Sequence, residues 1–473
     1  MNTQHIKTIS LLAAGIALAG CDEDKINKYL PKGEIRVIHA SADAPPVNVL
    51  LNGDAVIENL DYAESSGFAQ FRTGNYHIEV EGIIPGGNAT VISVPDFRLS
   101  KGDSPTIIAL NDVATIAPIV VQESAAQPES SEVALVVTHA ASVAGAVDVY
   151  VTAPGADISA ATPAFNFDFQ DSIDVGALGT GTVELQVGIG STLVYNSGPI
   201  DLTAFNGEKI MIVAVNSENQ VENTASPIKL LAVTDSATIE LKDADTAAGA
   251  KVVHASPDAN TAAGGPVEVF ATSPALGVDA VELIDAFDYT DIVPTADTFV
   301  EVPASTYQFD VAPDTDTIGD SVYTSPELSL GAGMEYTVIA AGRVLSTPGF
   351  SLLATADENR AIATQGSIKL THAAPAAGDV DVFVTAAGAF SKMEVESGMA
   401  GAPLLENFSF GTITDYVGVA PGSYDIRVVA GGTTAINIEG FTIAGGDVFH
   451  AIARGPSEPS GSFADFGVIV LSN

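Results

Sequence analysis

One motif occurs four times along the chain, and this repetition limits the possible folds more than any other feature. The first copy reads "VIHASADAPPVNV" from Val37. The other copies read "VTHAASVAGAVDVYV" from Val137, "VVHASPDANTAAGGPVEVFA" from Val252 and "LTHAAPAAGDVDVFV" from Leu370. The histidines of the motif are separated by 100, 115 and 118 residues: His39, His139, His254 and His372. This spacing is the length of a small domain and predicts four similar domains in tandem.

Further landmarks follow each histidine in the same order. An aromatic stretch comes first, as in "LDYAESSGFAQF", and an alternating segment such as "GSYDIRV" from Gly422 comes next. A glycine then precedes an alanine by seven residues in all four copies: Gly102 and Ala109, Gly207 and Ala214, Gly333 and Ala340, Gly446 and Ala453. Each copy closes on a short apolar stretch, for example "FGVIVLS". A shared order of landmarks indicates that each copy folds in the same way.

The periodicity within each copy is that of β-strands. In "GSYDIRVV", Tyr424, Ile426 and Val428 alternate with polar residues, as expected of a half-buried strand. Gly, Pro, Asn and Asp fill the gaps between such runs. We therefore predict an all-β chain of four tandem antiparallel, immunoglobulin-like β-sandwiches. The expected ranges are 33–121, 132–235, 248–356 and 366–473.

The start of the chain has the features of a bacterial lipoprotein signal. "MNTQHIKTISLLAAGIALAGC" contains one lysine, an apolar run and small residues before a cysteine. The apolar run is too short for a permanent membrane span. Leu18, Ala19, Gly20 and Cys21 resemble a lipobox, which implies removal of residues 1–20 and lipidation of Cys21, with acyl chains such as palmitate. Residues 21–32 would then form a lipidated linker, and Cys21, the only cysteine, has no disulfide partner.

Charge limits the possible partners. The chain has 59 Asp and Glu against 18 Lys and Arg, a net charge of −41. Such a surface repels the phosphates of nucleic acids and anionic lipids, so nucleic acid is excluded as a partner. We expect a monomer attached to a membrane through its lipid, on the extracytoplasmic side of the bacterial cell envelope. The sequence leaves open whether this is the inner or the outer membrane.

The repeated motif resembles a known family. "RVIHASADAPPVNVLLNG" and "KVVHASPDA" are similar to the bacterial domain of unknown function catalogued under number 4397, and all four copies share the resemblance. The first and third copies have the fullest form, whereas the second has Ser142 and Val143 in place of Pro-Asp. The resemblance implies an extracytoplasmic, immunoglobulin-like sandwich, but it implies no reaction and no ligand.

A histidine beside a serine and an acid suggests catalysis, but comparison of the copies favours a structural role. Counting back by twos from His39 gives Val37 and Ile35, so the histidine continues the more apolar face of its strand. Ser41 is retained in the third copy but replaced by Ala141 in the second. We therefore predict that His39, His139, His254 and His372 are structural and that the chain has no catalytic residues.

Two alternatives involve other residues. Gly102-Asp103-Ser104, Gly319-Asp320-Ser321 and the Asp447–His450 pair match elements of a lipase and esterase family, whose fold, however, needs long helices that this sequence lacks. Asp314, Asp316 and Asp320 are spaced loosely like a calcium loop, but Ser325 stands where the final glutamate is needed. Hydrolysis is thus a distant alternative, and we predict no metal site or cofactor, with calcium left open.

The function that these features favour is non-catalytic. We expect a lipid-anchored envelope protein whose sandwiches act in surface display, adhesion or envelope scaffolding through protein or glycan contacts. The alternative is a ligand- or calcium-binding sensing module in the envelope.

Overall fold

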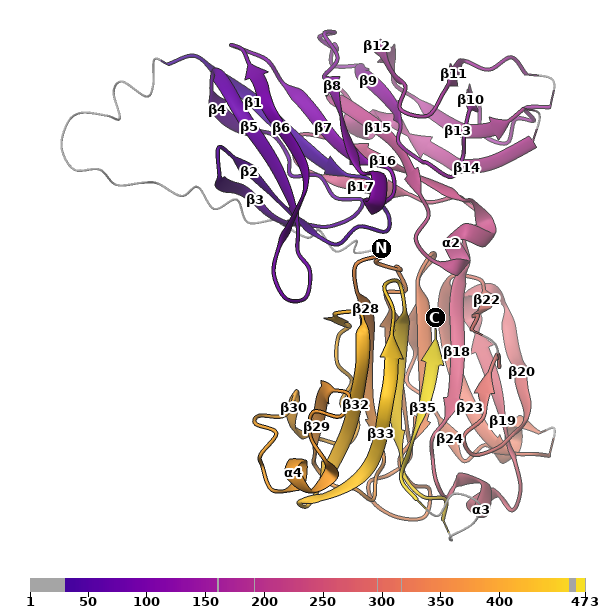
Figure 1. Cartoon of the computed structure of the whole chain (residues 1–473). Helices are drawn as coiled ribbons and strands as arrows, with labels where there is room; N and C mark the ends of the chain where they lie inside the picture. The colour runs from indigo at the N-terminus through magenta and orange to yellow at the C-terminus, as the bar shows by residue number, and fades with distance from the viewer. Residues whose placement is uncertain are drawn as a thin grey trace. The chain divides into compact units, whose positions relative to one another are not determined.

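A computed structural model of the chain describes residues 30–159, 161–190, 192–295, 297–315, 317–458 and 465–472. The described chain is almost entirely β-structure (Figure 1). Leu18, Ala19, Gly20 and Cys21 lie outside the described residues. Within the described part of the chain, helices are all too short or too polar to cross a bilayer.

Each copy of the motif opens a block of strands, which we call repeats 1 to 4. The strands of repeat 1 are β1 (Lys32–His39), β2 (Val47–Leu51), β3 (Asp54–Leu60), β4 (Ala69–Arg72), β5 (Gly74–Gly82), β6 (Ala89–Leu99), β7 (Pro105–Leu110) and β8 (Ala117–Gln122). Those of repeat 2 are β9 (Glu132–His139), β10 (Val147–Thr152), β11 (Phe165–Phe167), β12 (Ser172–Gly179), β13 (Thr182–Ile189), β14 (Thr192–Asp201), β15 (Lys209–Asn216), β16 (Ile228–Val233) and β17 (Thr238–Leu241).

The second half of the chain follows the same plan. Repeat 3 contains β18 (Ala248–His254), β19 (Val267–Ser273), β20 (Val278–Phe287), β21 (Ile292–Val293), β22 (Val300–Val302), β23 (Ser305–Pro313), β24 (Tyr323–Thr324), β25 (Leu328–Leu330), β26 (Glu335–Ala341) and β27 (Ser351–Asp357). Repeat 4 contains β28 (Gly366–Ala373), β29 (Val380–Ala386), β30 (Leu405–Phe408), β31 (Val417–Val419), β32 (Gly422–Ala430), β33 (Thr433–Ile443), β34 (Val448–Arg454) and β35 (Gly467–Ser472). The α-helices are short: α2 (Gln220–Ala225), α3 (Ala259–Ala263) and α4 (Lys392–Glu396).

Every repeat is a sandwich of two sheets, as the sequence predicts. One sheet, which we call the histidine sheet, has the order β4-β1-β7-β8 in repeat 1 and an equivalent order in the others. The second sheet has the order β3-β2-β5-β6. An apolar core fills the space between them, and in repeat 1 it includes Ile35, Val37, Val49 and Ile78.

The sheets are largely antiparallel, but each histidine sheet contains one parallel pair that the sequence did not predict. β1 runs parallel to β7, and the same holds for β9 with β15, β18 with β26, and β28 with β34. The chain leaves the first strand, builds the second sheet and returns in the same direction. In this register the repeated alanine pairs with the repeated histidine, Ala109 with His39 for example.

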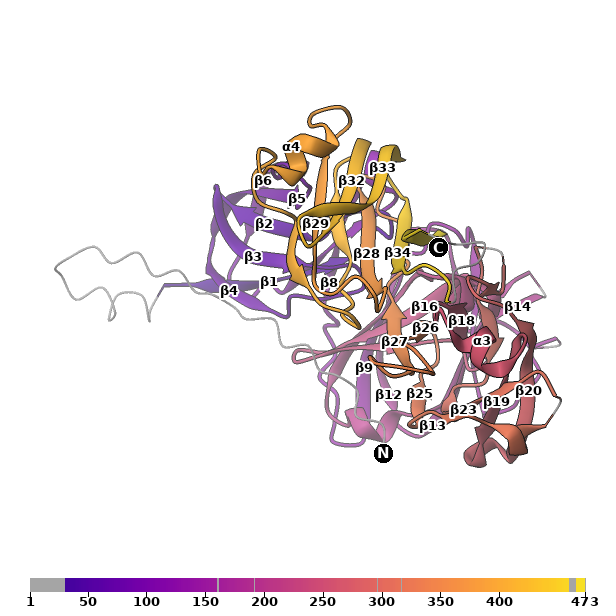
Figure 2. The same cartoon turned by 90° about the horizontal axis from the view of Figure 1, so that it is seen from below.

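The repeats form two compact units rather than four separate ones. Unit 1 holds repeats 1 and 2, and unit 2 holds repeats 3 and 4. Within unit 2 the two histidine sheets lie side by side (Figures 1 and 2) and share an apolar cluster that includes Val253, Ile339 and Ile452. Unit 1 has an equivalent cluster, in which Ile38 and Ile108 of repeat 1 pack against Met211 of repeat 2.

Both faces of each histidine strand are therefore buried. The inner face packs in its own sandwich and the outer face packs against the neighbouring repeat. This explains the nearly continuous apolar sequences of the parallel strands, such as "PTIIAL" in β7, where all six residues are buried.

A repeated hydrogen bond holds the backbone of the histidine. In each aromatic stretch, the residue that directly follows an aromatic side chain has a positive φ and donates its N–H to the histidine carbonyl. These residues are Ala63 (φ 60°), Gln170 (φ 77°), Thr290 (φ 79°) and Gly411 (φ 82°). In the repeated turn before the second parallel strand, Gly102, Gly207, Gly333 and Gly446 also have positive φ. A β-branched residue is strained in this conformation, whereas glycine adopts it freely.

The strain at Thr290 gives a testable prediction. We expect Thr290→Gly to raise the free energy of unfolding by about 0.5–1 kcal/mol, because the cost of a side chain in this conformation exceeds the entropy gained by the unfolded glycine. Gly411→Thr, the reverse change at the equivalent position of repeat 4, should lower it by at least as much. Urea unfolding of the purified chain measures both, and a less stable Thr290→Gly protein would contradict the prediction.

Candidate functional site

The histidine motif forms a clamp at the end of each first strand. In repeat 1, His39 is 0% exposed; its Nε2 donates to the carbonyl oxygen of Pro45 at 3.0 Å, and its Nδ1 accepts from the N–H of Ser41 at 3.3 Å. The ring meets Tyr62 edge-on, with the centroids 6.1 Å apart. Since a carbonyl only accepts, the proton of the ring lies on Nε2. The imidazole therefore joins the strand to both ends of the following turn.

Repeats 2 and 4 keep the bond from Nε2 to the turn. Nε2 of His139 donates to the Gly145 carbonyl at 2.6 Å, and Nε2 of His372 donates to the Gly378 carbonyl at 2.8 Å. Nδ1 of His372 also accepts from the N–H of Ala374 at 3.3 Å, whereas Nδ1 of His139 is buried without a hydrogen-bond partner among the described residues. Repeat 3 differs, because its turn is five residues longer and contains α3. Nδ1 of His254 still accepts from Ser256, at 3.3 Å, and the side chain of Asn260 in α3 takes the place of the turn carbonyl as its other hydrogen-bonding neighbour.

Burial favours the neutral imidazole in repeats 2 to 4. Desolvation lowers the pKa of His254 to about 4 and also lowers the pKa of His139 and His372. For His139 and His372, the hydrogen bond to the turn carbonyl opposes this effect only in part.

The side chains of Ser41 and Asp43 hold the turn that follows His39. The Ser41 hydroxyl donates to Asp43 at 3.4 Å, and Asp43 accepts the N–H of Val113 at 2.7 Å, which fixes the turn to a neighbouring loop. In repeat 3, Asp258 has the same role toward Val344 and Leu345, at 2.8 and 3.1 Å. A base that would activate a serine needs a free nitrogen facing the hydroxyl, and His39 Nε2 is used on Pro45.

A second polar group lies between the two repeats of unit 2. Asp357, at the end of β27, accepts hydrogen bonds from Thr337 at 2.6 Å, Lys369 at 3.1 Å and Tyr416 at 3.2 Å. Lys369 also lies 4.5 Å from the centre of the Tyr416 ring. Asp357 and Lys369 are each 3% exposed. A buried carboxylate and ammonium that satisfy each other in this way fix one register between the sheets that carry them.

The same group includes His450, the histidine of the esterase-like pattern. Its Nε2 lies 2.7 Å from the Thr371 hydroxyl and its Nδ1 lies 3.7 Å from Asp357. The order acid, imidazole, hydroxyl is that of a hydrolase triad. However, His450 is 0% exposed and Thr371 is 1% exposed, so a substrate cannot reach the hydroxyl. Burial lowers the pKa of His450 to about 4 despite the nearby Asp357.

The remaining residues of the esterase-like pattern are turn residues. The Asp447 carboxylate accepts the N–H of Ala444 at 2.7 Å, and the Asp103 carboxylate accepts the N–H of Ser100 at 2.7 Å, at equivalent turns of repeats 4 and 1. Asp320 accepts the Thr315 hydroxyl at 3.1 Å. The structure thus pairs His450 with Asp357 and not with Asp447.

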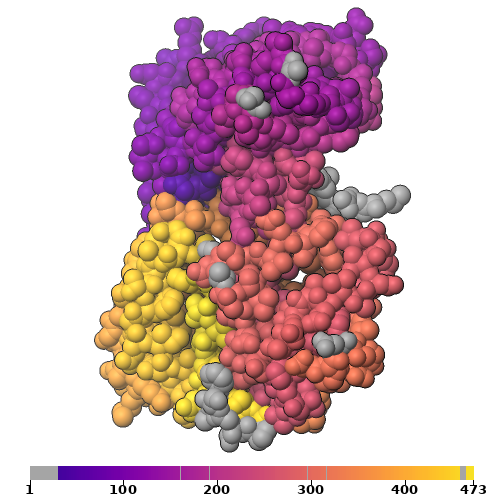
Figure 3. All heavy atoms as spheres, turned by 90° about the vertical axis from the view of Figure 1, so that its right-hand side faces the viewer, coloured from indigo at the N-terminus to yellow at the C-terminus, as the bar shows by residue number. Residues whose placement is uncertain are grey.

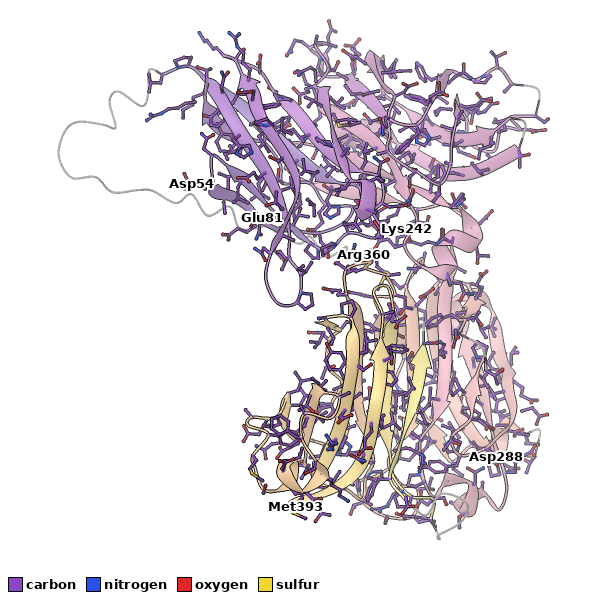
Figure 4. All side chains as sticks on the ribbon, viewed as in Figure 1. Asp54, Glu81, Lys242, Asp288, Arg360 and Met393 are labelled. Carbon is purple, nitrogen blue, oxygen red and sulfur yellow. The ribbon has the colours of Figure 1, made fainter. Side chains whose placement is uncertain are left out.

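Unit 1 also has buried polar groups between its two repeats, but they are made of other residues. Arg36 is 2% exposed, donates to Thr106 at 2.9 Å and lies 4.3 Å from the centre of the Phe68 ring. Burial lowers its pKa to about 10. Lys229, also 2% exposed, is bound by Glu218 and by Glu240. Lys242, labelled in Figure 4, binds Glu222 at 2.5 Å at the edge of the same group.

The calcium-like loop is described only in part, since Asp316 lies outside the described residues. Across residues 30–472, with the gaps given above, no group of three His, Cys, Asp or Glu side chains is arranged to hold a metal ion.

Sequence reasoning missed the polar groups between repeats. Arg36, Lys251 and Lys369 occupy the same position of the histidine strand, three residues before the histidine, and they look like solvent-facing residues there. Only repeat 2 has an apolar residue, Val136, and it faces Met211 where repeats 1 and 3 have threonine and repeat 4 has His450. The sequence did contain a signal of this burial: three of the four copies have a basic residue at this position, although the chain has few basic residues.

A family model describes the same motif. The model of the domain of unknown function DUF4397 matches residues 33–150 and 248–383, more than half of the chain. The chain belongs to this family. Each DUF4397 match covers one repeat, the first strand of the next repeat with its histidine, and part of the strand after it. The two matches begin at the two repeats with the fullest motif, and each ends within the partner repeat of the same unit.

Other comparisons add little. No curated protein matches the chain. Among solved structures, the Bacillus anthracis TIE protein is similar at 12% identity and a TM-score of 0.15, over 90% of this chain and 68% of that protein.

The depressed histidine pKa values predict how stability depends on pH. An unfolded histidine titrates near pH 6.5, so between pH 6.5 and 4 the unfolded chain binds more protons than the folded chain. The stability from neutral His254 and His450 is therefore present above pH 6.5 and lost as the pH falls toward 4. We expect each to contribute on the order of 3 kcal/mol to this loss.

Two variants test that assignment by urea unfolding at several pH values. His450→Met, which introduces the residue that repeat 2 carries at Met211, should flatten the dependence. Met393→Leu should leave it unchanged, because this exposed side chain carries no titratable group. Equal slopes for the parent and His450→Met would contradict the prediction.

The ion pair between repeats 3 and 4 gives a further prediction. Lys369→Met should lower the free energy of unfolding by about 3–5 kcal/mol, because it leaves the Asp357 charge buried without its ammonium. Adding Asp357→Leu should cost at least about 2 kcal/mol less than the sum of the two single changes. Lys392→Met is the control: its ion pair with Glu396 is exposed, and the change should stay within about 0.5 kcal/mol. Additive losses would show that the two residues act independently.

Proposed function

We propose that the chain is a non-catalytic protein of the bacterial cell envelope, anchored by lipid on Cys21, whose paired sandwiches act in display, adhesion or scaffolding. The observation that supports this proposal is the burial of the side chains that could take part in catalysis, namely the repeated histidines and the triad-like group. The repeated histidines are 0–2% exposed, and the acid, imidazole and hydroxyl of the triad-like group lie at 0–3% exposure. Residues in these positions stabilise the fold and have no access to a substrate.

The surface is suited to contacts made outside the cell. Removal of residues 1–20 takes away Lys7 alone among the charged residues, which leaves 17 basic against 59 acidic side chains. A strongly negative surface keeps a protein soluble and apart from anionic lipid headgroups. The lipid on Cys21 would then hold the protein at the membrane while the sandwiches remain in the aqueous space.

The anchor is tested by Cys21→Ser in the full-length chain expressed in a bacterium. We expect the parent to incorporate a labelled fatty acid and to fractionate with membranes, and the variant to lose both properties because it has no other thiol. Ser41→Ala, far from the signal, is the control and should behave as the parent. Unchanged labelling of the Cys21→Ser protein would overturn the proposed anchor.

A ligand-binding function is the second candidate, and one observation favours it. Repeat 3 contains an apolar cavity within its sandwich.

A further inference from the structure

The core of repeat 3 contains a cavity. A cavity of about 120 Å³ lies between its two sheets, with walls that include Val252 and Leu352 of the histidine sheet and Val269 and Phe309 of the second sheet. Leu283 and Val300 also line it, and they are 46% and 44% exposed, so the cavity reaches the surface beside β20 and β22. Figure 3 shows this face of unit 2, with a small opening between the spheres.

The cavity has a cause in the sequence. The residue four positions before the motif histidine is Ile35 in repeat 1, Leu135 in repeat 2 and Ile368 in repeat 4, and all three pack in or against the core. In repeat 3 this residue is Ala250, which lines the cavity. A missing aliphatic side chain leaves a void unless the surroundings collapse. Three sister domains thus show the filled form of the same site.

The polar groups beside the cavity have partners within the protein. His254 lines the cavity and is 1% exposed; its Nδ1 accepts from the N–H of Ser256 at 3.3 Å, and the side chain of Asn260 in α3 is its other hydrogen-bonding neighbour. Tyr307, which also lines the cavity, donates its hydroxyl to Pro303 at 2.7 Å. The remaining lining is aliphatic and aromatic, which favours an apolar occupant.

We propose that the cavity of repeat 3 binds an uncharged, apolar molecule of about six or seven non-hydrogen atoms, or the end of an alkyl chain. The size follows from dry apolar cavities, since one of about 150 Å³ binds benzene and this one has about 120 Å³. The apolar walls provide no partner for a charged group. This site goes beyond the proposed display function and does not depend on the lipid anchor.

The test uses the chain without its first 20 residues and carrying Cys21→Ser, with fluorobenzene as the probe observed by fluorine NMR. We expect saturable binding and a melting temperature raised by about 3–5 °C at ten times the dissociation constant.

Matched variants locate the binding. Ala250→Ile restores the residue of repeats 1 and 4, and it should weaken the binding of fluorobenzene at least tenfold without lowering the melting temperature of the free protein. Val281→Thr, on the same strand as Leu283 but outside the lining and 49% exposed, should bind as the parent. If Ala250→Ile fails to fold, Val252→Leu fills the cavity with the residue that repeat 4 has at Leu370.

The outcomes separate the parts of the proposal. No binding to the parent, or parent-like binding to a folded Ala250→Ile protein, would overturn the site. Nuclear Overhauser contacts between fluorobenzene and the Val252 and Val269 methyl groups in the parent decide the location without any variant. Loss of the predicted lipid anchor would leave all of these results unchanged.

Discussion

The whole structure depends on the burial of the histidine strand on both of its faces. In β1, Val37 packs inside the first sandwich, while the next residue, Ile38, packs against repeat 2. A strand buried on both faces lies in the middle of its sheet, and the parallel neighbour β7 fills the position beside it. Its last residue then has no solvent to satisfy its polar groups. The imidazole at that point solves the problem, because one ring bonds two backbone groups of the turn.

The period of two in the sequence was enough to predict the sandwiches and the inward face of the histidine. It could not predict the second buried face, because a half-buried strand and a fully buried one differ only in the residues between the apolar positions. In repeat 1 these residues are Arg36 and Ile38, and Arg36 looked like a surface residue. It is buried because its guanidinium meets Thr106 and the Phe68 ring, partners that are 70 and 32 residues away in the chain.

The parallel strand pairs were missed for a related reason. Alternation identifies a strand but carries no information about the direction of its neighbour. The spacing of glycine and alanine did mark the place, since Ala109 lies beside His39 in the parallel register. Alanine at this position has a physical reason, because a small side chain on the adjacent strand leaves room for an imidazole held in a fixed orientation. The repeated spacing marked the position, and the strand pairing explains why alanine occupies it.

Comparison among repeats separates what the fold requires from what one domain alone has. All four repeats keep the histidine, the positive-φ residue that binds its carbonyl, and the alanine beside it, so these belong to the fold. Repeat 3 departs from the others at this place: Ala250 replaces a large aliphatic residue, and the longer turn brings Asn260 to His254 in place of a turn carbonyl. The imidazole keeps a partner, whereas the missing aliphatic side chain leaves a cavity that destabilises the sandwich. A bound apolar molecule would compensate for that loss.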